Sequence, residues 1–398
     1  MHAKVDSGRL ARRWIANVFV DIYKLTMRMC SIGIDGVARR LVLPIAMSFT
    51  LISCQNLGPT SIRAGMPDYN AAILETGDEI TMLNFVRIRY LESPYFMEVT
   101  NVFTSPSFTA SAGGSAGVTT DLGNSADLRA ELSYSEAPTI VYTPVGGEQF
   151  STRLLEPVGL HTIGLLSQGG WDLDRLLRLC VQRINGVWNA EIATGPVREK
   201  PVPEYETFRR VTETMHELET SKEFVFEYGR KYRAGTLEEP IEFSILPEAR
   251  KRPEVQQLFV DLELDPNAES YFITDEKHVA GDRNIAIVSR PLLATMFYLS
   301  KGVVVPERDL NSKAVSVTLD EQGEPFDWQL VTGDLFRIES SDTRPDSAFR
   351  AVRYRNSWFY IRDDDPASKE TFMLFGSLLS LRAGEAPKSS TALTLPVR

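Results

Sequence analysis

The sequence predicts an α+β or α/β protein, with amphipathic helices, a long β-hairpin in its N-terminal half and a mixed strand-and-helix region after it. Three observations indicate this. Residues 172–185 place apolar side chains at helical spacing. Residues 128–135 alternate apolar and polar side chains, as a half-buried strand does. After residue 241, candidate strands and helices alternate along the chain.

The clearest helix is predicted over residues 172–185. Asp172 and Asp174 near its start and Gly186 after its end agree with the helix dipole and with glycine termination. Its apolar stripe consists of Leu173, Leu176, Leu177, Cys180, Val181 and Ile184. Two further helices are predicted, over about 70–91 and about 204–220.

The hairpin is predicted within residues 96–143, where Ser, Thr, Gly and Ala dominate. One arm contains the alternating residues 128–135 and continues through 139–143. Residues 96–110 form the other arm, with a less regular pattern. The Gly-rich stretch between the arms predicts a tip around residues 112–126.

The C-terminal region contains shorter elements. Ser368 is predicted to cap a helix that runs to Arg382 and ends before Gly384. The other candidates are strands at 241–245, 271–274, 284–288 and 392–397, a helix at 291–301, and a hairpin that joins 349–354 to 358–362.

The chain is expected to divide into four parts. Residues 1–53 form a signal-peptide region, and residues 54–67, polar with Gly and Pro, form a tether. A helix-plus-hairpin domain covers 68–195. The three prolines within residues 194–203 indicate a linker, and a mixed α/β domain covers 204–398.

An export signal precedes Cys54. Arg39 and Arg40 are followed by an apolar stretch from Leu41 to Ile52, which has the length of a signal core and is too short to span a bilayer. The stretch ends in Leu51-Ile52-Ser53-Cys54, which resembles the bacterial lipobox. That resemblance implies diacylglycerol transfer to the Cys54 sulfur, cleavage before it and acylation of the new amino group. In the alternative interpretation, 41–52 is a buried element and Cys54 an ordinary core residue.

Two details refine this interpretation. Translation from Met29 would give a signal of ordinary length, so Met29 is a candidate for the true start. Gln55 is not the Asp that retains lipoproteins at the inner membrane of enteric bacteria. We therefore expect an outer-membrane lipoprotein that faces the periplasm, with inner-membrane retention as the alternative.

The charge of the chain argues against nucleic-acid binding. The whole chain has a formal net charge of −10, and residues 1–53 hold 8 Lys or Arg and 3 Asp or Glu. The remaining 345 residues therefore carry a net charge of −15. Nucleic-acid binding depends on neutralising phosphates with basic residues. The expected partners are the membrane, through the N-terminal lipid, other envelope proteins, and further copies of the chain.

No catalytic motif appears. Zinc-protease, nucleophile-elbow and phosphate-loop patterns are absent from the sequence, so no enzyme activity and no cofactor are expected. Cys180 falls on an apolar stripe and is interpreted as a core residue. The carboxylates of Asp363, Asp364 and Asp365 are weak candidates for a metal site, with loop and helix-start roles as the alternative.

Four stretches resemble an uncharacterised family of Gram-negative envelope lipoproteins: Leu83–Tyr95, Tyr134–Phe150, Trp171–Asn189 and Ser289–Val305. The resemblance implies no activity. The favoured hypothesis is a structural or assembly protein of the bacterial cell envelope. The alternatives are a periplasmic ligand- or glycan-binding module, or a subunit of an oligomeric secretion pore that uses the 96–143 hairpin.

Overall fold

A computed structural model describes residues 57–103, 106–117, 125–136, 139–145, 148–195, 202–227, 241–274 and 281–383. The chain divides into two units, Met1–Thr76 and Gly77–Arg398. In the first unit the described residues are helical throughout. The second unit contains helices and strands in a mixed sheet and smaller sheets, which confirms the α+β prediction.

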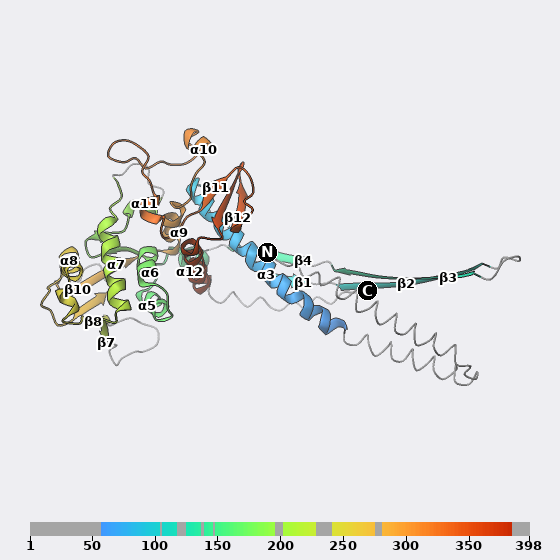
Figure 1. Cartoon of the computed structure of the whole chain (residues 1–398), viewed down its shortest axis with the longest axis horizontal. Helices are drawn as coiled ribbons and strands as arrows, with labels where there is room; N and C mark the ends of the chain where they lie inside the picture. The colour runs from blue at the N-terminus through green and yellow to red at the C-terminus, as the bar shows by residue number, and fades with distance from the viewer. Residues whose placement is uncertain are drawn as a thin grey trace. The chain divides into compact units, whose positions relative to one another are not determined.

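The helices are α3 (Leu57–Arg89), α4 (Glu148–Leu155), α5 (Leu160–Gln168), α6 (Leu173–Cys180), α7 (Glu206–Thr220), α8 (Pro253–Asp261), α9 (Leu292–Ser300), α10 (Glu307–Asn311), α11 (Gln329–Thr332) and α12 (Pro366–Ala383). The strands are β1 (Phe96–Phe103), β2 (Pro106–Gly117), β3 (Ser125–Glu136), β4 (Thr139–Val145), β5 (Val181–Ile184), β6 (Val187–Trp188), β7 (Phe224–Glu227), β8 (Ile241–Ile245), β9 (Tyr271–Thr274), β10 (Asn284–Ser289), β11 (Glu339–Ser341), β12 (Ala348–Tyr354) and β13 (Ser357–Arg362). Figure 1 shows their arrangement.

Helix α3 begins earlier than the composition predicts. The tether expected over residues 54–67 is wrong from Leu57 onward, because α3 starts there rather than near Asn70. Pro59 lies in the first turn, where a missing N–H costs no helical hydrogen bond. Pro67 lies in the interior of α3, where a proline disfavours a helix because it removes a hydrogen bond and crowds the preceding turn, yet the helix continues through it.

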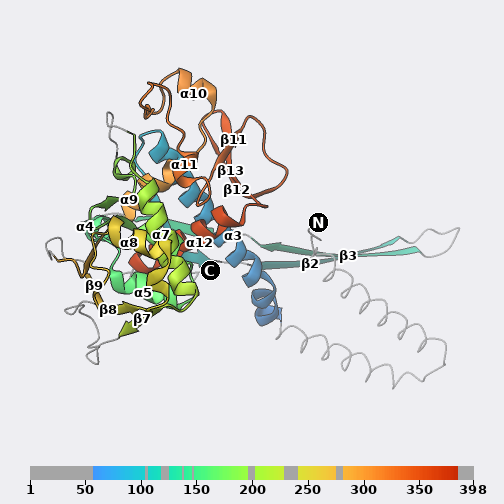
Figure 2. The same ribbon diagram turned by 60° about the vertical axis from the view of Figure 1, so that its left-hand side comes forward.

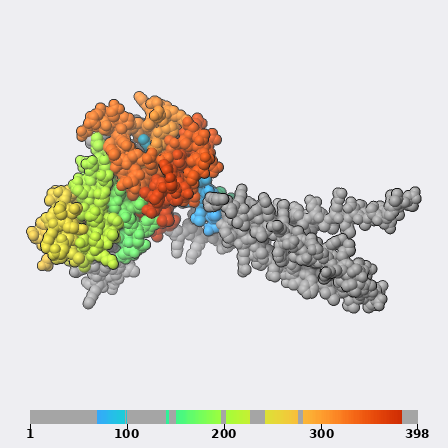
Figure 3. Space-filling view, viewed as in Figure 1, coloured from blue at the N-terminus to red at the C-terminus, as the bar shows by residue number. Residues whose placement is uncertain are grey.

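One sheet joins both sides of the predicted linker. Its strand order is β6-β5-β10-β9-β8-β7, and all neighbours are antiparallel except β10 and β9. Strands β5 and β6 precede residues 194–203 and the other four follow them. The division into domains 68–195 and 204–398 is therefore not the one found, and the green and yellow-green segments adjoin in Figure 3.

The helix predicted over 172–185 ends halfway. Helix α6 stops at Cys180, and Val181 to Ile184 form strand β5, which pairs with β10 and β6. Asn185 makes the turn with a left-handed φ of 49°. Its side chain also donates to the Leu262 carbonyl at 2.7 Å and accepts from the Ala286 amide at 2.7 Å. Sheet pairing thus overrides the helical spacing of Val181 and Ile184.

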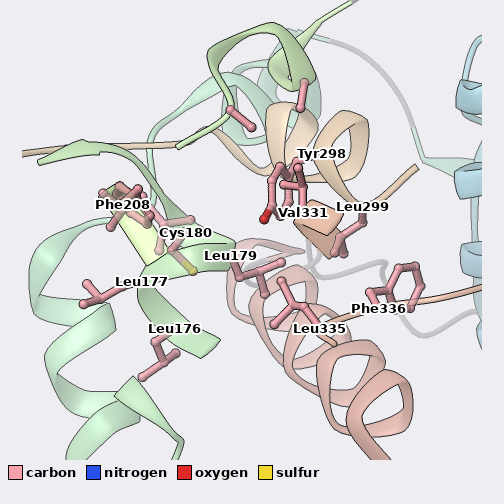
Figure 4. Packing of buried hydrophobic residues seen from close by; sticks show 14 of the residues in the cluster. Leu176, Leu177, Leu179, Cys180, Phe208, Tyr298, Leu299, Val331, Leu335 and Phe336 are labelled. Atoms are coloured by element: carbon pink, nitrogen blue, oxygen red, sulfur yellow. The ribbon is translucent and has the colours of Figure 1, made fainter. Parts of the chain in front are cut away.

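In the core, α6 packs against α7, α9 and β5, and α7 packs against β6. Arg175 of α6 also donates to the Thr371 hydroxyl of α12 at 2.6 Å. Figure 4 shows Leu179, Cys180, Tyr298 and Leu335 from three different segments around one buried region. Cys180 is fully buried, and this burial raises the pKa of its thiol to about 12. The interpretation of Cys180 as a core residue is confirmed.

Two buried cations lie near one another in this core. Lys301 is 9% exposed, and its Nζ lies 4.9 Å from the centre of the Trp328 ring. Burial, and then the charge of Arg89, lower the pKa of Lys301 from 10.5 to about 8. Between those two pH values the unfolded chain keeps a proton that the folded chain has released.

This difference predicts how stability depends on pH. Because the unfolded state binds more protons between about pH 8 and 10.5, the contribution of Lys301 to the free energy of unfolding rises there, by at most about 1.4 kcal/mol per pH unit. Lys301→Met should lack that rise. Urea unfolding of both proteins at several pH values measures it, and the other titrating groups cancel in the difference. A difference that is constant from pH 7.5 to 10.5 would refute the assignment.

Candidate functional site

The hairpin contains two antiparallel strand pairs, β1 with β4 and β2 with β3. Strands β1 and β4 pair as far as Phe103 with Thr139, and β2 and β3 begin with Pro106 opposite Glu136, which is the same register. The single irregularity lies between Val99 and Asn101. Figures 1 and 2 show β2 and β3 side by side. The predicted hairpin is confirmed, but its strands extend to Gly117 and Ser125, further than a tip at 112–126 allows.

The start of the hairpin is fixed to the end of α3. The side chain of Asn84, which is fully buried, accepts from the Tyr95 amide and donates to the Tyr95 carbonyl, both at 2.9 Å. The next residue, Phe96, packs edge-on against Phe150 of α4, with ring centres 5.2 Å apart. A rigid attachment of this kind defines where β1 leaves the core.

The outer part of the hairpin has two chemically different faces. Residues directly opposite each other in an antiparallel pair share a face, and faces alternate along each strand. Over residues 108–116 and 126–134, one face carries the pairs Phe108–Tyr134, Ala110–Leu132, Ala112–Ala130, Gly114–Leu128 and Ala116–Ala126, and the pair Pro106–Glu136 lies on the same face beyond them. The other carries Ser107–Ser135, Thr109–Ser133, Ser111–Glu131, Gly113–Arg129 and Ser115–Asp127. The five pairs of the first set contain no charged residue, no Ser and no Thr. The second set contains no apolar residue larger than glycine.

The apolar run has the length of a membrane-spanning strand. It covers nine positions in each strand, 108–116 and 126–134. At roughly 3.3 Å per residue, nine positions extend about 26 Å. Spanning strands need about 9–11 residues and present an apolar band about 25 Å tall, bordered by aromatic residues. Phe108 and Tyr134 are the paired aromatic residues at one end of the run.

The hairpin also leaves hydrogen-bonding edges open. Strands β2 and β3 form a sheet of two strands within the described residues. Each strand therefore pairs through one edge only, and alternate N–H and C=O groups along the other edge lack a ladder partner. Such an edge is a template for a strand of another chain.

The acidic cluster at residues 363–365 is used for local structure. Asp363 accepts from Lys369 at 3.0 Å, and Asp364 forms two bonds with Arg362, at 2.8 and 2.6 Å, which hold the pKa of Asp364 below its ordinary value. Asp365 accepts from the Ser368 amide at 3.0 Å and the Ser368 hydroxyl at 2.6 Å.

Asp365, and not Ser368, is therefore the residue that caps α12, with Pro366 in the first turn. The three carboxylates bond to three different partners and do not converge. In the part of the chain that the structure describes, no group of three or more His, Cys, Asp or Glu residues is arranged to hold a metal ion. These bonds agree with the loop and helix-start roles that the sequence offered as the alternative for Asp363, Asp364 and Asp365.

A cavity of about 320 Å³ lies beneath α5. Its apolar lining includes Ile163, Met215 and Phe243, and its polar lining includes Ser167 and Glu219. The Ser167 hydroxyl donates to the Glu219 carboxylate. The cavity can accept a small apolar ligand, and its residues come from segments too far apart for any local sequence pattern to reveal it.

Cys54, the predicted lipidation site, lies outside the described residues. None of the described helices is both long and apolar enough to cross a bilayer. No protein-family model, curated protein or solved structure matches the chain.

Proposed function

We propose that this chain is a lipid-anchored structural protein of the bacterial cell envelope, and that several copies assemble a membrane pore from their hairpins. The observation that carries the proposal is the two-faced hairpin, whose apolar face extends over nine positions of each strand. A face of this length matches the hydrocarbon layer of a membrane. The Ser- and Thr-rich opposite face suits a water-filled interior.

The open edges support assembly from several copies. In hydrocarbon, each backbone N–H or C=O without a partner costs several kcal/mol, so a lone hairpin is unstable there. Pairing β2 of one copy with β3 of the next satisfies both edges, and a closed ring leaves none. The second copy is therefore the expected partner of each edge.

The Leu51-Ile52-Ser53-Cys54 motif supports an anchor close to α3, since α3 begins three residues after Cys54. An acylated Cys54 would concentrate copies at the membrane surface before their hairpins insert. A lipid anchor would also hold an acidic body at a membrane surface, because the attachment does not depend on charge.

The anchor predicts a clear mutant result. Cys54→Ala should abolish labelling with radioactive palmitate and move the protein from the membrane fraction to the soluble fraction. Labelling in cells and membrane fractionation measure both effects, with Cys180→Ala as the matched control that keeps the label. Unchanged labelling of Cys54→Ala would refute lipidation at this residue.

The pore is tested with protein extracted from native membranes in mild detergent. The expected result is a large oligomer on a sizing column, which releases a small encapsulated dye when reconstituted into liposomes. A monomer that releases no dye would refute the pore. In that case the cavity beneath α5 favours a second function, periplasmic binding of a small apolar ligand. Saturable binding of a fluorescent fatty acid by the monomer would support it.

A further inference from the structure

The charges on the polar face of the hairpin are confined to one strand. Within β2 and β3, this face carries Asp127, Arg129 and Glu131, at alternate positions of β3. Their partners in β2 are Ser115, Gly113 and Ser111, which have no charge. The other residues on this face are Ser, Thr and Gly.

From this placement we infer that the pore conducts cations in preference to anions, an inference that rests on the proposed function. Asp127 and Glu131 lie on either side of Arg129 in the strand, about 6–7 Å from it along the backbone. One guanidinium offsets one carboxylate, so each copy contributes a net charge of −1 to the wall at this level. Rings of Asp and Glu are a common basis of cation selectivity.

The charges of neighbouring copies act together. Two strands per copy, spaced about 4.8 Å apart, place successive β3 strands roughly 10 Å apart around the wall. That distance is close to the screening length of about 8–10 Å at 0.1–0.15 M salt. Small Ser, Thr and Gly residues elsewhere on the face offer no bulky or aromatic surface for solute binding. Charge is thus the property by which this wall distinguishes solutes.

The test is the reversal potential of the purified full-length protein in a planar bilayer, under a tenfold gradient of potassium chloride. The expected wild-type pore favours potassium over chloride. Glu131→Gln removes the net charge and should bring the ratio of potassium to chloride permeability close to 1. Arg129→Gln doubles the net charge to −2 and should raise the ratio. Ser133→Gln, on the same face of the same strand, adds the same side chain without changing charge and should leave the ratio unchanged.

A second measurement covers variants that conduct poorly. Ser133→Cys places a thiol on the polar face, whereas native Cys180 is fully buried and does not compete for reagent. A cationic thiosulfonate should modify the new thiol several-fold faster than an anionic one of similar size. Arg129→Gln should increase this ratio of modification rates. Raising the salt concentration to about 1 M shortens the screening length to about 3 Å. It should therefore reduce both the preference for potassium over chloride and the preference for the cationic reagent.

The outcomes separate the two proposals. Absence of any conductance or dye release by the wild-type protein would overturn the pore itself. Conductance with an anion preference, or with a ratio that Glu131→Gln and Arg129→Gln leave unchanged, would overturn cation selectivity and leave the pore standing. Opposite shifts in the two variants would support the inference.

Discussion

Ala112→Lys is expected to abolish membrane insertion, whereas Ser111→Lys should leave it nearly intact. Ala112 and its partner Ala130 are the central positions of the two apolar runs, 108–116 and 126–134. A lysine on the lipid face at the bilayer midplane costs about 2–4 kcal/mol. In a ring, every copy bears that cost, so the assembled pore loses far more free energy of insertion than a single hairpin does.

The control differs only in the face that it occupies. Ser111 is the adjacent residue, belongs to the same strand and pairs with Glu131. Both substitutions add one lysine, so they change net charge and strand propensity in nearly the same way. Dye release from liposomes and the size of the detergent-extracted oligomer measure the result. Equal activity of the two variants would show that the apolar face does not contact lipid.

The sequence revealed the hairpin but not both of its faces. Leu128, Leu132 and Tyr134 make the alternation of β3 visible without a structure. In β2 the corresponding residues are mostly Ala and Gly, whose small size hides the pattern from a hydrophobicity count. Only the register, which places Ala110 opposite Leu132, shows that both strands share one apolar face.

Other differences between the predicted and the observed elements have local causes, and some of these causes are visible in the sequence. Val181 and Ile184 continue a helical stripe, yet both are β-branched, and the Asn185-Gly186 pair that follows them is a strong signal for a hairpin turn. Composition alone suggested a tether at 54–67, although proline is tolerated in a first helical turn. By contrast, the hydrogen bonds of Arg290 end on main-chain carbonyls, which no side-chain pattern encodes.

Arg290→Met is expected to destabilise the body by about 3–5 kcal/mol. Arg290 is fully buried, and in the described residues no carboxylate is among its hydrogen-bond partners. Its guanidinium donates to the carbonyls of Arg178, at 2.8 Å, and of Asn189, and lies 4.0 Å from the centre of the Tyr298 ring. Burial lowers the pKa of Arg290 to about 10, so it still carries its charge at neutral pH.

The position of these carbonyls explains why a buried cation is tolerated. The last carbonyls of α6 have no partner within the helix, because the chain turns into β5 after Cys180. Arg290 satisfies the Arg178 carbonyl through its side chain and the Cys180 carbonyl, at 2.6 Å, through its own amide. A cation at a helix C-terminus also interacts favourably with the helix dipole. Arg290 is thus the residue that terminates α6 and joins it to β10.

Methionine fills much of the same space but donates no hydrogen bond. A buried acceptor left without a partner costs about 1–3 kcal/mol, and two or more are affected here. The Asn189 side chain still donates to the Arg178 carbonyl at 2.9 Å, which limits the loss at that group. Urea unfolding of the purified protein measures the change in the free energy of unfolding.

Arg283→Met is the matched control. Arg283 is exposed, and its guanidinium bonds to the Ser270 carbonyl at 3.0 Å and stacks on Phe272. The same substitution there should cost less than about 1 kcal/mol, because water can replace the lost donor. Since whole domains are stable by only about 5–15 kcal/mol, Arg290→Met should also lower the yield of folded protein. Equal costs at Arg290 and Arg283 would mean that the carbonyls at the end of α6 are satisfied without Arg290.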